Sequence, residues 1–328
     1  MKNIDLCGIG NSLVDIQYEV SENELKELQI AKGEMRLVEA DVQQDIIRKL
    51  KSKTPHKSSG GSAANTIIAF SQFGGKAAYM SKLGDDDFGN FYFNEFEDFG
   101  IILYSDRIKN DPTGTCLILI TPDSERSMLT CLGASAKFGK VDLSNDLIEK
   151  SSWIYIEGYK FSQGSSSEAV FKAIEIAKKF NTKISLTFSD VFIIENFHEK
   201  ISRAVKESDL IFCNEFEALN YTGSSGIEQA IKILDDECPN YAITRGKNGA
   251  IVKWGNRLYE IPAYPVTAVD STGAGDMFAA GFFYGLINSG SPETAGKLGS
   301  YAASVVVSQL GARLNTGYSK IKEAILKK

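Results

Sequence analysis

The sequence predicts an α/β fold in which helices cover both faces of a mostly parallel sheet and a small β-rich lid covers one edge. Strand-like apolar runs alternate with amphipathic helical stretches over most of the 328 residues, and repeated βα units of this kind build parallel sheets. Residues 12–38 and 104–132 interrupt this rhythm with β-like patterns and turn residues. The 43% hydrophobic content is that of an ordinary globular protein with a sizeable core.

The N-terminal part begins with Ile4–Gly10, a short apolar run that ends in glycine, as an opening buried strand would. A Gly-Gly turn leads into the helix expected at Ala63–Phe73, and the apolar run Ala77–Leu83 predicts the next strand. Asp86–Phe99 has apolar residues at helical spacing and stops at Gly100, so we expect a second helix there.

The C-terminal half of the chain continues the alternation of one strand and one helix. The expected strands are Trp153–Glu157, Lys183–Phe188, Leu210–Cys213 and Tyr241–Thr244. The expected helices are Ser166–Phe180, Phe197–Lys206, Ile227–Asp235 and Met277–Asn288. Open α/β sheets bind ligands at the carboxyl ends of their strands, so polar residues that follow a strand are candidates for a site.

The β-like stretches predict the lid. Thr115–Thr121 and Met128–Leu132 are separated by turn residues, which is typical of a β-hairpin. Pairing with the first β-like stretch would give a small sheet, although extra edge strands of the core would show the same pattern. We therefore divide the chain into an α/β core at residues 1–11, 39–103 and 133–328 and a lid at residues 12–38 and 104–132.

Composition excludes several classes of protein. The formal net charge of -6 comes without a basic block, which argues against a nucleic-acid partner. No signal-peptide core and no apolar run of membrane-spanning length occurs, so we expect a cytoplasmic protein with no membrane partner. The five cysteines form no CxxC pair and there are only two histidines, so we expect buried thiols and neither a zinc site nor a histidine-based triad.

The strongest chemical motif is a heptapeptide before the last expected helix. It consists of Asp270-Ser271-Thr272-Gly273-Ala274-Gly275-Asp276. The small residues allow a tight turn that points N–H groups into one space at the positive end of a helix, which predicts an anion hole at Gly273–Gly275. Asp276 would repel phosphate there, unless it is a catalytic base that removes a proton from a hydroxyl while the amides neutralise the transferring phosphoryl group.

Two further groups of residues suit a polyhydroxylated substrate. In Gly60-Gly61-Ser62-Ala63-Ala64-Asn65, the glycines permit close approach of a ligand, and the Asn65 amide offers the donor and acceptor that suit a diol. Asn11 and Asp15 follow the first strand, and a carboxylate there would accept two sugar hydroxyls. Helix packing at the Gly-Gly motif and a merely solvated Asp15 are the alternatives.

Two more motifs suit a nucleotide. Asn214 and Glu217 follow the strand that ends at Cys213, and a glutamate there would orient water around Mg²⁺. An N-capping asparagine with a first-turn glutamate explains this pair equally well. Thr244-Arg245-Gly246 follows the next strand and would contact nucleotide phosphates.

Other nucleotide-binding motifs are absent from the sequence. None of the four Gly-Lys pairs is followed by Ser or Thr, so there is no P-loop. Gly8 and Gly10 suggest a dinucleotide-binding turn, but Leu13 stands where the third glycine would be, and no helical pattern follows.

Together these motifs resemble the ribokinase-like (PfkB) carbohydrate kinases over nearly the whole chain, and the heptapeptide is highly specific. Within that family the chain is most similar to the adenosine kinase branch. The stretches that carry this similarity are Gly10–Ile16, Pro112–Cys116, Tyr155–Tyr159, Asn214–Ala218 and Tyr301–Ser304. One departure concerns Ala63 and Ala64, where animal adenosine kinases carry bulkier polar residues.

The resemblance implies a Rossmann-like, ribokinase-like core with the ATP site and a small β-sheet lid over the substrate. The implied substrate-binding residues are Asn11, Asp15, Gly61, Ser62, Asn65 and Tyr159. The implied ATP and Mg²⁺ residues are Asn214, Glu217, Thr244 and Gly246, with Asp276 as base and no direct protein ligand to the metal. Candidates to stack on a nucleobase are Leu132, Ala134, Tyr159 and Phe192, and Arg126 would close over the phosphates.

We therefore predict an ATP-dependent kinase of purine salvage that phosphorylates the 5′-hydroxyl of adenosine. A kinase acting on a free sugar or sugar acid is the first alternative, because the Gly60–Asn65 motif also suits such enzymes. A nicotinamide dehydrogenase and a catalytically silent binding protein are disfavoured by the missing third glycine and by Asp276. A monovalent-cation requirement and the choice between monomer and homodimer stay open.

Overall fold

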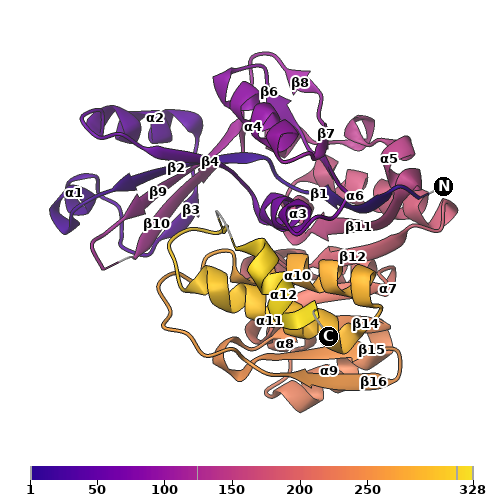
Figure 1. Ribbon diagram of the computed structural model, residues 1–328. Helices are drawn as coiled ribbons and strands as arrows, with labels where there is room; N and C mark the ends of the chain where they lie inside the picture. The colour runs from indigo at the N-terminus through magenta and orange to yellow at the C-terminus, as the bar shows by residue number, and fades with distance from the viewer. Residues whose placement is uncertain (1, 124, 315–316, 327–328) are drawn as a thin grey trace.

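Two sheets of unequal size organise the chain (Figure 1). The computed structural model describes residues 2–123, 125–314 and 317–326. The strands of the larger sheet are, in spatial order, β16 (Arg257–Ile261), β15 (Ala250–Trp254), β14 (Asn240–Thr244), β13 (Leu210–Asn214), β12 (Lys183–Thr187), β11 (Ser151–Glu157), β1 (Ile4–Ile9), β5 (Ala77–Met80) and β7 (Ile102–Tyr104). All neighbours from β7 to β14 are parallel, whereas β15 and β16 form antiparallel pairs. The mostly parallel sheet is thus confirmed.

Helices cover both faces of this sheet, because its central strands are apolar on both sides. One layer shares a core with Leu6 of β1 and contains α3 (Ser62–Gln72), α4 (Asp87–Asp98), α10 (Ala274–Ser289), α11 (Pro292–Val307) and α12 (Tyr318–Leu326). The other layer shares a core with Cys7 and contains α5 (Asn145–Lys150), α6 (Gly164–Lys179), α7 (Val191–Lys206), α8 (Glu215–Thr222) and α9 (Ile227–Glu237). None of the described helices has the length and hydropathy needed to cross a membrane.

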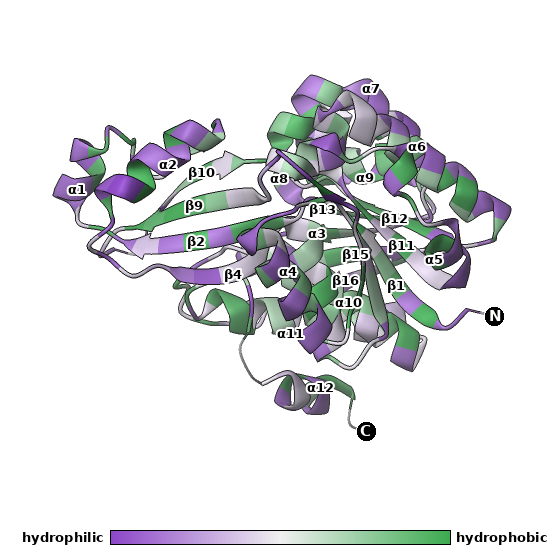
Figure 2. Ribbon diagram, turned by 90° about the horizontal axis from the view of Figure 1, so that it is seen from above, coloured by the Kyte–Doolittle hydropathy of each residue, from purple (hydrophilic) through white to green (hydrophobic). Residues whose placement is uncertain are grey.

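The smaller sheet projects from one end of the larger one, as Figures 1 and 2 show. Its strands are, in spatial order, β3 (Met35–Leu37), β10 (Arg126–Cys131), β9 (Gly114–Ile120), β2 (Leu13–Glu19) and β4 (His56–Gly60). The antiparallel β9–β10 hairpin and its parallel pairing with β2 join the two β-like stretches, as the sequence predicted. A further two-stranded sheet joins β6 (Leu83–Gly84) to β8 (Arg107–Ile108).

The expected boundary between core and lid needs one correction. β4 pairs with β2 in the smaller sheet, although we assigned residues 39–103 to the core. Its sequence, HKSSG, contains no apolar residue, so periodicity gave no indication of a strand. α2 (Ala40–Lys49) also packs on this sheet, because the buried Gln43 donates to the carbonyl oxygens of Thr115 and Leu129 at 3.1 and 2.6 Å.

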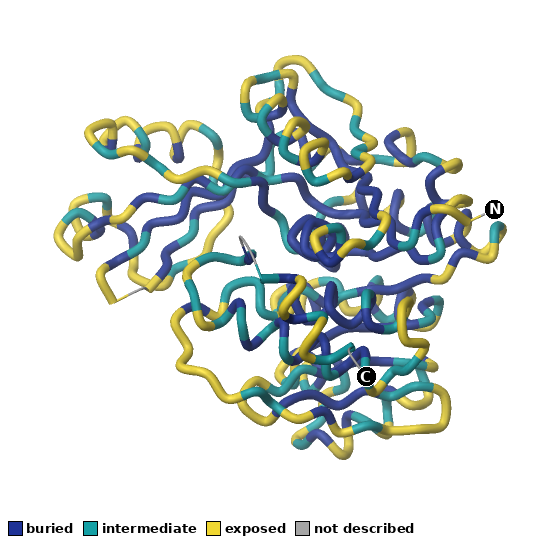
Figure 3. The backbone as a smooth tube through the Cα atoms, in the orientation of Figure 1, coloured by how far each residue is buried: buried dark blue, intermediate teal, exposed yellow. Residues whose placement is uncertain are grey.

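The smaller sheet has an outer and an inner face. Val14, Ile16 and Tyr18 point outward and share a core with Leu25 of α1 (Glu22–Glu27) and Ile46 of α2. The two helices themselves are largely exposed (Figure 3). Because side chains alternate along a strand, Asp15 and its paired neighbours on β9 and β10 face the other way, toward the core.

Candidate active site

Two cavities meet where the carboxyl ends of the parallel strands face the smaller sheet. The first measures about 470 Å³ and has a largely apolar lining. The second measures about 280 Å³ and is bounded by the start of α10 and the ends of β12, β13 and β14. Ser62 and Tyr159 line both cavities, and Asp276 lines the second.

Asp276 lies in the first turn of α10, and the first two turns of α3 hold its carboxylate. Oδ1 accepts a hydrogen bond from Ser62 Oγ at 2.6 Å, and Oδ2 accepts one from Asn65 Nδ2 at 3.2 Å. Burial raises the pKa of Asp276 to about 6, although these two hydrogen bonds act to lower it. A carboxyl group with such a pKa is ionised near neutral pH and is basic enough to accept a proton.

The turn before α10 is built as predicted, with one correction. Gly273 has φ 75°, and a Cβ there would lie 2.4 Å from the carbonyl oxygen of Ala312, so only glycine fits. The Ala274 N–H donates to Ser271 O at 3.2 Å and is therefore occupied. Among the described residues, the amides of Gly273 and Gly275 have no backbone partner, which leaves them for an anion.

Asp270 ties this turn to two other segments. Its Oδ1 accepts from the Thr272 N–H and its Oδ2 from the Gly311 N–H, both at 2.9 Å. Oδ2 also pairs with Arg126 Nη1 of β10 at 2.5 Å. Burial raises the pKa of Asp270, but these hydrogen bonds and the positive charge of Arg126 outweigh it and hold the pKa below its ordinary value. We expected Arg126 to close over the phosphates, but in the structure it is buried and pairs with Asp270.

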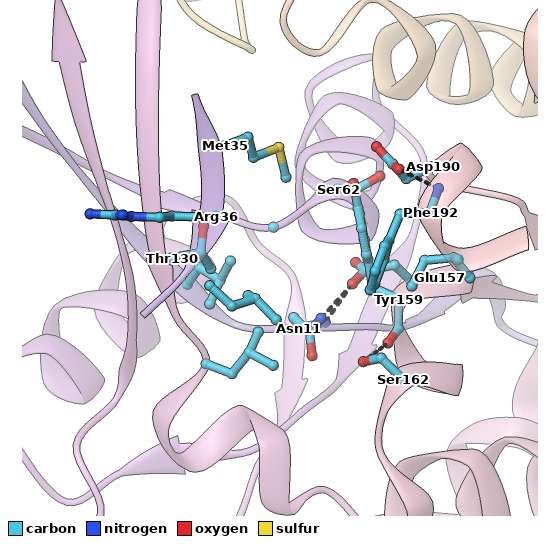
Figure 4. Close-up of a pocket in the computed structure, with 15 residues that line it drawn as sticks. Asn11, Met35, Arg36, Ser62, Thr130, Glu157, Tyr159, Ser162, Asp190 and Phe192 are labelled. Carbon is cyan, nitrogen blue, oxygen red and sulfur yellow. Dashed lines mark hydrogen bonds between the residues drawn. The ribbon is translucent and has the colours of Figure 1, made fainter. Parts of the chain in front are cut away.

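Most of the predicted substrate-binding residues line the first cavity. Asn11, Ser62 and Tyr159 do so (Figure 4), as does Gly61. Gly61 has φ 106° with its backbone against Asn11 O. Asn65 lines neither of these cavities, and its buried Oδ1 has no hydrogen-bond partner among the described residues.

Asp15 does not line the cavity wall itself. It lies on the inner face of β2 against Gly60, where a Cβ would come within 2.4 Å of its Oδ1. Burial raises the pKa of Asp15 to about 6, and the positive charges of Arg313 and Arg126 oppose that rise. Arg313, which no sequence motif indicated, also donates to Glu95 at 3.4 Å.

Sequence reasoning missed the buried network beneath the cavity. Glu157, at the end of β11, accepts from Asn11 Nδ2 at 2.8 Å and from the Ala63 N–H at 2.9 Å. Lys160 Nζ donates to Asn11 Oδ1 at 3.0 Å and to Ser135 O at 3.1 Å. Burial raises the pKa of Glu157 and lowers that of Lys160. The network fixes the Asn11 amide and the start of α3, the helix that carries Ser62.

The apolar lining of the first cavity comes from both sheets. Leu132, Tyr159 and Phe192 contribute to it as expected, whereas Ala134 is fully buried and does not line it. The sequence missed Met35 and Leu37 of β3, which are 55% and 59% exposed.

The second cavity contains the Asn214–Glu217 pair. Asn214 Oδ1 accepts from the Glu217 N–H at 2.8 Å, and Glu217 Oε2 accepts from the Asn214 N–H at 2.9 Å, so the pair does cap α8. Both residues also line the cavity. Burial raises the pKa of Glu217 to about 7, and the negative charges of Asp190 and Asp276 add to this rise. Within the described residues, no group of three His, Cys, Asp or Glu side chains would hold a metal ion directly.

A third cavity of about 550 Å³ continues from the second. Thr244 lines both, and Gly246 lines the third. Its walls are mainly apolar and include Tyr264, Pro265, Val266, Ala303 and Val307. The polar second cavity therefore borders both apolar ones: it shares Ser62 and Tyr159 with the first and Thr244 and Gly275 with the third.

Known proteins are similar to this chain in sequence and fold over most of its length. A family model described as pfkB family carbohydrate kinase matches residues 34–317. The adenosine kinase of Saccharomyces cerevisiae is 30% identical over 93% of this chain and 95% of its own length. A 5-dehydro-2-deoxygluconokinase of Clostridium tetani is 30% identical over 78% of this chain and 80% of its own length. The crystal structure of adenosine kinase from Sinorhizobium meliloti superimposes with a TM-score of 0.88 and 31% identity, covering 98% of this chain and 99% of that one.

Proposed function

Because the chain belongs to the PfkB family of carbohydrate kinases, and so is a phosphotransferase with an alcohol acceptor, we propose that it phosphorylates the 5′-hydroxyl of adenosine with ATP. The observation that carries this proposal is the apolar cavity of about 470 Å³ next to Ser62 and Asp276. Its size is typical of sites for drug-sized ligands. A free sugar would leave most of its apolar wall uncovered, whereas a nucleobase would cover it.

In the proposed mechanism, Asp276 takes the proton of the substrate hydroxyl as the hydroxyl oxygen attacks the γ-phosphorus of ATP. The bond from this phosphorus to the β,γ-bridging oxygen breaks, and ADP leaves. The free amides of Gly273 and Gly275 stabilise the charge that develops on the transferring phosphoryl group. The carboxylate of Asp276 is already oriented by Ser62 and Asn65, so little reorganisation is needed on binding.

The remaining predicted residues have supporting roles in this proposal. The free Oδ1 of Asn65 and the carboxylate of Asp15 would hold ribose hydroxyls. The smaller sheet would act as a lid that excludes water, the competing acceptor. The third cavity would take the adenine of ATP, with Thr244 and Gly246 toward its phosphates.

Magnesium fits the second cavity through water rather than by direct coordination. Glu217 is 6% exposed, lines this cavity and has a raised pKa, so a nearby cation would favour its ionised form. When bound with ATP, Mg²⁺ would neutralise phosphate charge, and Glu217 with Asn214 would orient its water shell.

A sugar-acid kinase is the second candidate. The C. tetani relative is a 5-dehydro-2-deoxygluconokinase, and the polar residues Asn11 and Thr130 line part of the first cavity. Arg36 also lines it, but its guanidinium pairs with Glu34 at 3.5 Å and points away from Ser62 (Figure 4). In this case the terminal primary hydroxyl of the sugar acid would lie at Asp276, and its carboxylate would lie toward β3.

ADP production from ATP·Mg²⁺ with adenosine, inosine, ribose, fructose and a sugar acid tests both candidates. Turnover of adenosine well above that of the free sugars supports the proposal. Turnover of the sugar acid alone overturns the nucleoside assignment and retains the mechanism. The same assay in Na⁺ and K⁺ buffers tests the monovalent-cation requirement.

A further inference from the structure

A strained turn follows β12 at the edge of the first cavity. The Asp190 N–H donates to Phe188 O at 2.9 Å, which closes a three-residue turn around Ser189. Ser189 has φ 72°, a backbone conformation that is costly for a residue with a side chain. Such strain persists only where the surrounding structure enforces it, and it is found most often at functional sites.

Two contacts with the residues that directly follow β11 hold this turn. Ser189 Oγ accepts a hydrogen bond from the Gly158 N–H at 2.9 Å. Ser189 O accepts one from the Tyr159 hydroxyl at 3.5 Å. The Gly158 backbone also packs against the carbonyl oxygens of Thr187 and Phe188, where any Cβ would clash. The position of the next residue, Asp190, is therefore determined by contacts on both sides.

The carboxylate of Asp190 has one occupied and one open oxygen. Oδ1 accepts from the Phe192 N–H at 2.7 Å and so caps α7. Within the described part of the chain, no donor lies within hydrogen-bond distance of Oδ2 and no Lys or Arg pairs with the carboxylate. Asp190 lines the first cavity together with Phe192 and Ile193, which supply its apolar wall on that side (Figure 4).

This placement is unusual for a carboxylate. An ionised carboxylate only accepts hydrogen bonds, and beside an apolar wall it needs a donor. The nearby carboxyl groups of Glu217 and Asp276 offer none, and the negative charge of Asp190 contributes to the raised pKa of Glu217. Asp190 is only partly buried, so solvent reaches Oδ2, and a bound molecule that covers this oxygen has to supply a donor in place of water.

We propose that Asp190 Oδ2 accepts a hydrogen bond from an amino group on the nucleobase, so that the enzyme selects amino-substituted purines over keto-purines. This inference rests on the proposed nucleoside kinase function. It assigns the base to the wall formed by Phe192 and Ile193, because the hydroxyl that reacts is at Asp276. A keto oxygen at the same place would face the carboxylate oxygen and be repelled.

Asp190→Asn reverses the hydrogen-bonding character of this position. The Phe192 N–H needs an acceptor, so the amide oxygen stays on it and the amide NH₂ takes the place of Oδ2. Asparagine caps a helix as well as aspartate does, so α7 should keep its start. The variant therefore presents a donor to the cavity where the wild type presents an acceptor.

The experiment measures kcat/KM for adenosine, inosine and purine riboside, which has hydrogen in place of the amino group. We expect Asp190→Asn to lower kcat/KM for adenosine by about 10- to 100-fold. The kcat/KM for purine riboside should change by no more than a few-fold, and the ratio of kcat/KM for inosine to that for adenosine should rise. Glu195→Gln removes a carboxylate from the same helix outside the cavity and should leave all three ratios unchanged.

An equal loss of kcat/KM for all three nucleosides in Asp190→Asn would overturn this inference but not the proposed function. A loss that disappears at high Mg²⁺ would also overturn it, since Asp190 would then act on the metal. If the wild type turns over no nucleoside, the proposed function fails and the inference fails with it.

Discussion

Ser62 donates a hydrogen bond from its Oγ to Oδ1 of Asp276 across 2.6 Å and so joins the first residue of α3 to the first turn of α10. Asn65 binds the other carboxylate oxygen, and Thr66 Oγ1 contacts the Asp276 carbonyl oxygen at 3.3 Å. Three residues from two turns of one helix thus hold the residue that we propose as the catalytic base. The orientation and the pKa of Asp276 therefore depend on α3.

Asp276→Asn should lower kcat by about 10²- to 10⁴-fold, because the amide cannot accept the proton of the hydroxyl. ATP binding should change little, since the free amides of Gly273 and Gly275 belong to the backbone. Steady-state kinetics and a nucleotide-binding titration check both statements. A variant with near-normal kcat would remove Asp276 from the role of base.

The pH dependence of kcat/KM should show an acid limb near pH 6. Asp276 acts only when ionised, and its pKa is raised to about 6, so activity falls as the pH drops through that value. Ser62→Ala removes a hydrogen bond that lowers this pKa, so the limb should move to higher pH.

The control for this pH experiment is Asp15→Asn. Asp15 also has a pKa raised to about 6. If the ionised form of Asp15 is needed to bind ribose, its titration makes the acid limb of the kcat/KM profile steeper. Asp15→Asn should then make the limb shallower without moving it to higher pH. A limb that stays in place in Ser62→Ala would show that Asp276 does not control it.

The parts of the fold and site that depend on local patterns could be predicted. The strands β1 and β11 to β14 are rich in apolar residues, and the Gly273–Asp276 turn depends on small residues next to a helix start. For the Asn214–Glu217 pair, the sequence was compatible with both a helix cap and a role in orienting water around Mg²⁺. The structure supports the cap directly and places the pair in the polar cavity.

The parts that depend on contacts between distant segments could not be predicted. The expected helix at Phe197–Lys206 missed the first half of α7, because the backbone kinks at Phe197 (φ -133°, ψ 28°) and the apolar period breaks there. The missed half carries Phe192 and follows the strained Ser189. A positive φ at serine leaves no trace in composition, so the sequence could not indicate this turn.

The Glu157–Lys160 network was missed for a related reason. Asn11 follows β1, Glu157 ends β11, Lys160 lies in the turn after β11 and Ala63 is in α3, and each is unremarkable by itself in the sequence. Only the fold brings Glu157 to both Asn11 and the start of α3. A charged residue at the end of a buried strand is a weak indication that could have been used, because burial of an unpaired charge is costly.

Breaking the ion pair between Arg126 and Asp270 should destabilise the protein. Both residues are 8% exposed, and Arg126→Met leaves the Asp270 carboxylate buried with only two N–H donors. We expect a loss of about 3–5 kcal/mol in the free energy of unfolding, measured with urea. The double variant Arg126→Met, Asp270→Asn should lose less unfolding free energy than Arg126→Met alone, because it no longer buries an uncompensated negative charge.

A matched control for this pair is Lys137→Met. Lys137 pairs with Asp111 at 2.6 Å, but its side chain is 58% exposed, so the loss should stay below about 1 kcal/mol. If Arg126→Met costs no more than this control, the connection between β10 and the anion-binding turn contributes nothing to stability.

Glu217→Gln should raise the Mg²⁺ concentration needed for half-maximal activity by about 10-fold or more, as is typical when a residue that orients metal-bound groups is lost. The wild-type requirement should also depend on pH. The pKa of Glu217 is raised to about 7, so the carboxylate is mostly protonated at pH 6 and mostly ionised at pH 8. Mg²⁺ favours the ionised form, so the wild type should need less Mg²⁺ at pH 8 than at pH 6.

The glutamine variant cannot ionise and should lose this pH dependence. Glu215→Gln is the control, because Glu215 lies on the same helix and pairs with Arg245 at 3.4 Å, but does not line the second cavity. It should leave the Mg²⁺ requirement unchanged at both pH values. A pH dependence that survives in Glu217→Gln would assign it to another group, such as the nucleotide phosphates, and would remove Glu217 from the proposed metal site.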